Sequence, residues 1–151
     1  MVSALTAQRR LMTPNYIALG GPMPQILGLI IGGALGTLCR YLITVATHSL
    51  LPSSAFPLAT ITVNVLGCFL LGMLSHMGRV EYGSPALQLA LGTGFAGAFT
   101  TFSTFELEAD TLARGGAWDL AAIYVISSLV LGYASLLLGR FTATWLIGRP
   151  I

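Results

Sequence analysis

The chain has 151 residues, of which 55% are hydrophobic and 8% are charged. A soluble domain carries about 25% charged residues and disordered chains are polar, so a mean hydropathy of +0.84 excludes both classes. The net charge of +2 provides no basic face for binding nucleic acid. Cys39 and Cys68 lie in apolar runs and give neither a disulfide framework nor metal-ligand spacing. The class that remains is an integral membrane protein of the all-α type.

Long stretches without Asp, Glu, Lys or Arg separate the few charges, at residues 11–39, 41–78, 82–105 and 120–139. Since a membrane helix needs about 20 mostly apolar residues, these stretches predict four transmembrane helices. Pro24, Pro57 and Pro85 mark the first three starts, because proline's missing N–H costs nothing in the first helical turn. Trp118 and Trp145 suit interfacial anchors for the last helix. The expected spans are residues 25–47, 57–77, 85–108 and 117–143.

Residues 1–24 are expected to form a poorly ordered extension that precedes a four-helix transmembrane domain at residues 25–151. Four spans place both termini on one side of the membrane. Because the Lys and Arg content of the flanks sets orientation, a balanced chain can insert in both directions and form an antiparallel homodimer. The Arg residues outside the extension are nearly balanced between the two sides: Arg79, Arg140 and Arg149 against Arg40 and Arg114.

The first span contains a ladder of small residues, Gly28, Gly32 and Gly36. Small residues let helices approach closely where lipid supplies no hydrophobic force between them. The ladder suits either packing within one bundle or a contact between subunits, and the sequence leaves both open. Four thin helices can hardly enclose a pore alone, so oligomerisation is expected.

The third span carries the clearest polar signal, the run GTGFAGAFTTFSTFELE. Gly is a poor helix former and β-branched Thr adds strain, so a break near Gly97–Thr100 is expected. Backbone carbonyls freed at membrane depth form an oxygen site for a small hard cation. The alternative is a continuous Gly-rich helix, which periodicity alone does not exclude.

Two aromatic residues of this run, Phe102 and Phe105, are three positions apart and share one helical face. The edge of an aromatic ring is positive, so two edges turned into a narrow path favour a small anion. Core or lipid-facing phenylalanines are the alternative. Ser103 and Thr104 place hydroxyls on a different face, where they offer a separate polar track.

The second and fourth spans also carry polar stripes. Thr60, Asn64 and Gly67 share a face of the second span, and Asn64 suits either an interhelical hydrogen bond or a polar path. Serine in a membrane helix often bonds to its own helix, which is the alternative for the fourth span. There the stripe consists of Tyr124, Ser128 and Ser135.

Arg40 is the one charge expected inside a span, where it either snorkels to the surface or draws anions into a vestibule. Glu108, at the end of the third span, is a possible partner for it. His48 and His76 lie near span ends and are interpreted as ordinary interfacial residues. The sequence contains no GxSxG, HExxH or phosphate-binding glycine loop, so enzymatic chemistry has no visible carrier.

Three motifs together resemble the small microbial fluoride channels, the Fluc (CrcB) family. They are GGALGTLCRYL in the first span, TITVNVLG in the second and GTGFAGAFTTFSTFELE in the third. The resemblance covers residues 26–146. It implies a dual-topology, antiparallel homodimer of four-helix subunits, with a broken third helix and two ion paths.

The resemblance also implies roles for individual residues. A structural sodium ion is held in the broken helix by backbone oxygens, at positions that match Gly97 and Thr100. Arg40 matches a vestibule arginine, and Glu108 matches an acidic position that follows the aromatic pair. The fluoride path is lined at the positions that match Asn64, Phe102, Ser103, Thr104, Phe105, Tyr124 and Ser128.

The implied function is a fluoride-selective passive channel of the cell membrane, which exports cytoplasmic fluoride and reduces its toxicity. Hydrogen fluoride is a weak acid that crosses membranes in its neutral form and dissociates inside the cell. An inside-negative membrane potential then drives the fluoride anion out, at about 2.3 kcal/mol per charge per 100 mV. One alternative is a proton-coupled small multidrug-type exporter, which needs a membrane-embedded acid where the first span has Arg40. Another is a non-transporting structural subunit, in which Asn64 and the TTFSTF run only join helices.

Overall fold

The computed structural model describes residues 22–52, 54–79 and 84–147 of the chain. The described residues form helices and connections, without a strand. Three long helices dominate: α2 (Pro22–Leu50), α3 (Leu58–Arg79) and α7 (Trp118–Ile147). A fourth helical region follows α3 and precedes α7 in the sequence. It is subdivided into α4 (Pro85–Leu89), the π-helix η1 (Ala90–Ala96), α5 (Gly97–Phe99) and α6 (Phe102–Arg114).

The three long helices have the length and composition of membrane spans. Each contains an apolar window of high mean hydropathy, between 1.8 and 2.0, with few charges. Helix α2 begins at Pro22, so the expected extension of residues 1–24 overlaps its first turn, and residues 1–21 lie outside the described part of the chain. The protein is therefore an all-helical, multi-pass membrane protein.

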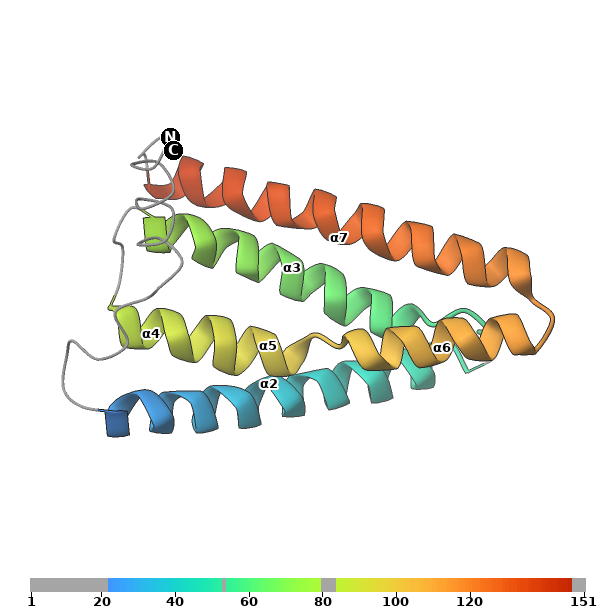
Figure 1. The fold of residues 1–151 in the computed structure, drawn as a ribbon, viewed down its shortest axis with the longest axis horizontal. Coiled ribbons are helices and arrows are strands. Elements are labelled where there is room, and N and C mark those ends of the chain that lie inside the picture. The colour runs from blue at the N-terminus through green and yellow to red at the C-terminus, as the bar shows by residue number, and fades with distance from the viewer. Residues whose placement is uncertain (1–21, 53, 80–83, 148–151) are drawn as a thin grey trace, which may run out of the picture.

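The helical regions run alternately up and down, so consecutive regions are antiparallel (Figure 1). Ser84 starts the fourth region, because its side chain accepts a hydrogen bond from Leu87 N at 3.2 Å. Gly116, with φ of +84°, makes the tight turn that leads into α7. The beginning of α2 and the end of α7 consequently lie at the same end of the bundle (Figure 1).

Glycines bring the helix backbones into direct contact. A Cβ atom on Gly72 of α3 would overlap the carbonyl oxygen of Leu136 in α7, and one on Gly139 of α7 would overlap that of Phe69 in α3. This reciprocal pair of contacts joins α3 to α7 at a separation that larger side chains would prevent.

The glycine ladder of α2 packs inside the chain, which answers the question that the sequence left open. Gly32 lies against the carbonyl oxygen of Ala90, and Gly36 lies against that of Phe95, both in η1. Gly28 follows the same line, since its Cβ position is 3.1 Å from the Cβ of Ala90. The ladder therefore holds η1 against α2 and is not left free for another subunit.

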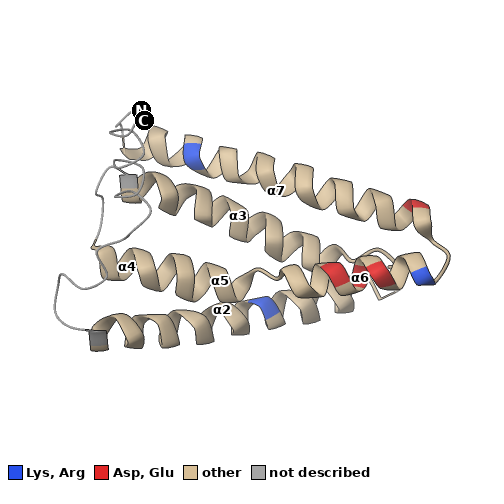
Figure 2. Ribbon diagram, viewed as in Figure 1, with Lys and Arg blue, Asp and Glu red and all other residues tan. Residues whose placement is uncertain are grey.

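Large apolar side chains are exposed over much of the molecular surface. Along α2, the exposed large side chains include Ile30, Ile31, Leu35, Leu38 and Leu42. Most described charges lie toward one end, on α6 and at the start of α7, with single basic residues in α2 and near the end of α7 (Figure 2). This distribution leaves an apolar belt around the helices, as a lipid environment requires.

The glycine contacts predict different changes in stability for two alanine substitutions in α2. Gly36→Ala forces a methyl group against the Phe95 carbonyl and should lower the free energy of unfolding by about 1–3 kcal/mol. Gly33→Ala should cause no loss, because its nearest neighbour, the Gly94 oxygen, is 4.0 Å from the new Cβ atom. Thermal unfolding in detergent, followed by circular dichroism, measures both. Equal loss in the two variants would contradict the assigned helix contact.

Candidate ion path at the interrupted helix

The fourth helical region is interrupted at two consecutive threonines. Thr100 (φ −79°, ψ 161°) and Thr101 (φ −148°, ψ 120°) are extended, and they separate α5 from α6. Thr100 closes α5, because its backbone N and its Oγ1 both donate to the Ala96 oxygen at 3.0 Å. Thr101 caps α6 by accepting a hydrogen bond from Thr104 N at 3.3 Å. The interruption thus lies at the C-terminal edge of the predicted 97–100 segment.

The side chain of Asn64 binds the extended backbone as another peptide group would. Its Nδ2 donates to the Thr101 oxygen at 3.0 Å, and its Oδ1 accepts from Thr101 N at 2.8 Å. Both polar groups of the Thr101 backbone are therefore satisfied by α3. Asn64 therefore makes the interhelical hydrogen bond that was one of its two predicted roles. The second amide hydrogen of Nδ2 remains available to another acceptor.

The break frees the carbonyl groups of residues 97–100 from the helical pattern, because a helix end leaves its last four carbonyls without an intrahelical donor. In a continuous helix, Thr101 N would donate to Gly97 O and Thr104 N to Thr100 O. Here those amides donate to Asn64 and to the Thr101 hydroxyl instead. Gly97 and Thr100, which the resemblance assigns to a cation, are the first and last residues of this set.

Arg40 points to the interruption. Its Nη1 donates to the Thr100 oxygen at 3.4 Å, and the side chain is half-buried between α2 and the extended segment. It does not pair with Glu108, so the suggestion that the two are partners is wrong. The ion pair found among the described residues joins Arg114 to Asp110, 2.7 Å apart on the exposed side of α6.

Glu108 instead receives two hydroxyl groups from neighbouring helices. Thr60 of α3 donates to Oε1 at 3.0 Å, and Tyr124 of α7 donates to Oε2 at 2.6 Å. Thr60 and Tyr124 are buried and Glu108 is partly buried. Hydrogen bonds to a charged group are stronger than neutral ones, so this carboxylate joins α3, α6 and α7.

Aromatic rings continue from Glu108 to the interruption. The rings of Phe102 and Phe105 are 5.8 Å apart at 41°, and the Phe105 and Tyr124 rings are 5.2 Å apart at 52°. The shared face expected for the two phenylalanines is thus present. Their exposure differs greatly, because Phe105 is 6% exposed in the core of the chain whereas Phe102 is 72% exposed.

The remaining hydroxyls take different positions. Ser103 and Thr104 lie exposed in the first turn of α6, where Thr104 accepts from the Thr101 hydroxyl at 2.9 Å. The Ser128 hydroxyl is buried and has no hydrogen-bond partner in the described part of the chain. Ser135 donates to the Val65 oxygen of α3 at 2.8 Å, so it bonds to a neighbouring helix and not to its own.

Sequence reasoning did not assign site roles to Thr60 and Thr101. Thr60 precedes Asn64 by one helical turn, and this spacing was the available signal. Thr101 is one of two adjacent threonines, and no pattern distinguishes the one that Asn64 binds. Both residues complete the polar contacts between α3 and α6.

The fold and the site define a class: a multi-pass helical membrane protein whose polar groups gather at an interrupted helix. Residues 27–140 match the family described as "CrcB-like protein, Camphor Resistance (CrcB)". Because the match extends over most of the sequence, the chain belongs to this family.

Relatives in several bacteria carry the name "Fluoride-specific ion channel FluC". The protein from Chlorobium chlorochromatii is 40% identical over 125 residues, which cover 82% of this chain and 95% of that one. The protein from Prosthecochloris aestuarii is 47% identical over 74% of this chain and 87% of its own length. The protein from Acidobacterium capsulatum is 44% identical over 76% of this chain and 92% of its own length.

The Asn64 contact predicts a large stability effect at one position of α3. Asn64→Ala leaves both polar groups of the Thr101 backbone without partners and should cost about 2–4 kcal/mol of unfolding free energy. Thr62→Ala is the control, because Thr62 is exposed and bonds only to the Leu58 oxygen of its own helix. Unfolding in detergent should separate the two variants. Similar stabilities for both would show that the Thr101 backbone does not depend on Asn64.

Proposed function

We propose that the protein is a fluoride-selective passive channel that exports cytoplasmic fluoride across the cell membrane. The observation that carries the proposal is the extended pair Thr100–Thr101, fixed by Asn64 beside Phe105 and Tyr124. This arrangement occurs in a chain whose relatives, over nearly their whole length, are named fluoride-specific ion channels.

The chemistry of the site suits a small, strongly hydrated anion. Such an ion leaves water only where hydrogen-bond donors and positive dipoles replace its hydration shell. The remaining amide hydrogen of Asn64, the unpartnered hydroxyl of Ser128 and the ring edges of Phe102 and Phe105 are groups of this kind. Tyr124 contributes its ring, because its hydroxyl hydrogen is held by Glu108.

The proposal includes a fourth membrane span built from the segments α4 to α6. This region runs antiparallel to α3 and α7 beside α2, and its interruption lies within the bundle (Figure 1). An interrupted helix is tolerated at membrane depth where its backbone groups find partners. Asn64 and the Thr101 side chain supply such partners here.

A second copy of the chain, inserted in the opposite direction, completes the path in this proposal. Phe102 is mostly exposed, and Ser103 and Thr104 beside it are also exposed, although all three stand next to the interruption. Hydroxyl groups exposed to lipid are unfavourable. A second protein subunit packed over Ser103 and Thr104 would remove them from the lipid. The near balance of Arg across the two sides of the membrane supports an antiparallel homodimer.

A structural sodium ion fits the carbonyl groups released at the break. Hard cations prefer oxygen ligands, and the helical donors of Gly97 and Thr100 are both diverted. Each chain would supply these two carbonyls, and binding sodium at Thr100 would replace its 3.4 Å contact with Arg40. A bound cation adds a fixed positive charge close to the path of an anion.

Fluoride flux through purified protein in liposomes tests the proposed function. Vesicles loaded with potassium fluoride should release fluoride when valinomycin compensates the charge, because passive export moves a net negative charge. Release should not require a proton gradient, and chloride-loaded vesicles should retain chloride. A fluoride electrode and a chloride electrode measure both. Absence of fluoride release, or equal chloride release, would overturn the channel proposal.

The aromatic pair predicts the effect of removing ring edges. Phe102→Ile and Phe105→Ile should each reduce fluoride flux about tenfold, which corresponds to about 1.4 kcal/mol in the barrier and to the range of aromatic contacts. Leu107→Ile is the control, because Leu107 is an exposed apolar residue of the same helix. Size-exclusion chromatography checks that each variant keeps its assembly. Wild-type flux in both phenylalanine variants would remove the rings from the path.

A further inference from the structure

The first part of the interrupted helix contains a π turn between two α-helical turns. At its start, Ala90 N makes the α-helical bond to the residue four positions earlier. Where η1 ends, Gly97 N donates to Gly92 O, five residues earlier. Thr100 N then donates to Ala96 O, again four residues earlier. A π turn set into an α-helix occurs frequently at functional sites, and this one directly precedes α5 and the break.

The π turn matches the spacing of two glycines in α2. Gly32 faces the Ala90 oxygen and Phe95 N, which are five residues apart. Gly36, one turn later, faces the Phe95 oxygen and Phe99 N, which are four residues apart. Five residues of η1 therefore run beside four residues of α2. In an α-helix five residues advance about 7.5 Å and turn about 140° away from the starting face, so the Ala90 and Phe95 oxygens could not both meet α2.

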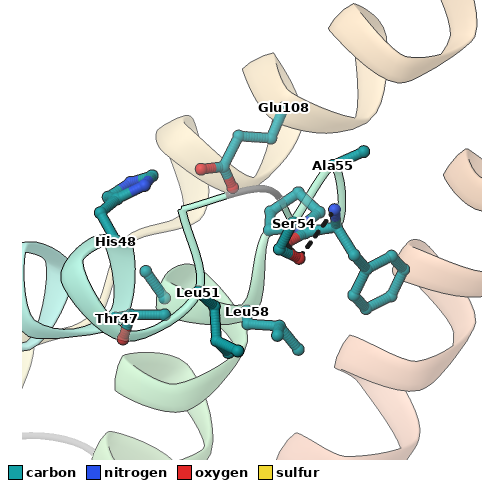
Figure 3. Close-up of a pocket in the computed structure, with 10 residues that line it drawn as sticks. Thr47, His48, Leu51, Ser54, Ala55, Leu58 and Glu108 are labelled. Atoms are coloured by element: carbon teal, nitrogen blue, oxygen red, sulfur yellow. Dashed lines mark hydrogen bonds between the residues drawn. The ribbon is translucent and has the colours of Figure 1, made fainter.

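The helix is also fixed on the other side of the break. Glu108 extends from α6 toward the last turn of α2 and the connection that follows it, where its side chain lines a small pocket (Figure 3). Its oxygens accept hydrogen bonds from Thr60 and Tyr124, so α6 cannot slide along the bundle without losing both. The number of residues between the Gly36 contact and Glu108 therefore determines where the break lies.

We propose that η1 contains one residue more than an α-helix of the same length, and that this surplus residue sets Thr100 and Thr101 opposite Asn64. Without the π turn, the residues after η1 would advance by about 1.5 Å and turn by about 100°. The Thr101 backbone would then leave Asn64, and the Thr100 oxygen would leave Arg40. η1 is thus a positioning element for the interruption. This inference goes beyond the proposed function, because it concerns the register of the helix and not the ion that passes it.

Deletion of Gly92, inside η1, tests the proposal. It places the Ala90 and Phe95 oxygens four residues apart, so that an ordinary α-helix brings both to α2 and leaves the break in place. Gly92 has no side chain, and a Cβ atom there would have no neighbour within 4 Å, so its loss removes no packing contact. The variant should melt within about 3 °C of the wild type in detergent.

Deletion of Ala98 is the matched control, because it removes one small residue between the Gly36 contact and the break. It either moves the break away from Asn64 or restores the register by placing the Phe95 ring in the fully buried site of Ala96. Both results are unfavourable, so this variant should melt at least about 6 °C below the wild type.

A double-mutant cycle with Asn64→Ala reports the register itself, which overall stability alone does not. The substitution should lower the melting temperature of the Gly92 deletion as much as that of the wild type, because the contact with Thr101 is kept. In the Ala98 deletion the contact is already lost, so the substitution should cause no further decrease.

A Gly92 deletion that melts as low as the Ala98 deletion, or that no longer responds to Asn64→Ala, would overturn the proposal. Wild-type stability in both deletions would overturn it as well, because η1 would then not set the register. Fluoride flux in liposomes keeps this result separate from the proposed function. If the wild type conducts, the Gly92 deletion should conduct and the Ala98 deletion should lose flux. If the wild type does not conduct, the proposed function fails, and the melting temperatures still decide the role of η1.

Discussion

The pair of hydrogen bonds between Asn64 and the Thr101 backbone is the contact on which the interrupted helix depends. An unpaired peptide group in an apolar environment costs several kcal/mol, and ending one helix and starting another exposes several of them. A side-chain amide is the one neutral group that offers a donor and an acceptor in the spacing of a peptide. By binding Thr101 through both atoms, Asn64 keeps the chain extended for two residues. The release of the carbonyls of residues 97–100 follows directly from this.

Glycine makes this contact geometrically possible. Gly67 lies one turn after Asn64 on the same face of α3, and a Cβ atom there would overlap Cγ2 of Thr100. One face of α3 thus accepts the side chain of Thr100 and binds the backbone of Thr101. On the other side of the segment, Gly36 lets η1 approach α2 closely enough for Arg40 to reach the Thr100 oxygen. The interruption is held from two helices, each through a glycine and a polar side chain.

The sequence predicted the long apolar helices, the neighbourhood of the interruption and the proximity of Phe102 to Phe105, because each follows from local composition or from the helical period. It could not predict which groups meet across helices. The partners of Glu108 depend on the axial offset between α3, α6 and α7, which is determined by glycine contacts such as Gly72 with Leu136. The same limit explains why Arg40 was suggested as a partner of Glu108. Periodicity assigns a residue to a face, and packing decides what that face meets.

Glu108 shows how a carboxylate can lie beside the proposed path for anions. A free negative charge at membrane depth would repel the ion and would itself be costly. Thr60 and Tyr124 direct two hydroxyl hydrogens at its oxygens, so part of its charge is neutralised and its position is fixed at the end of the aromatic row. The interruption itself has released carbonyls and a contact with Arg40 of α2, and no described acid bonds to it. The carboxylate of Glu108 is therefore held at the end of the aromatic row by Thr60 and Tyr124, away from the interruption.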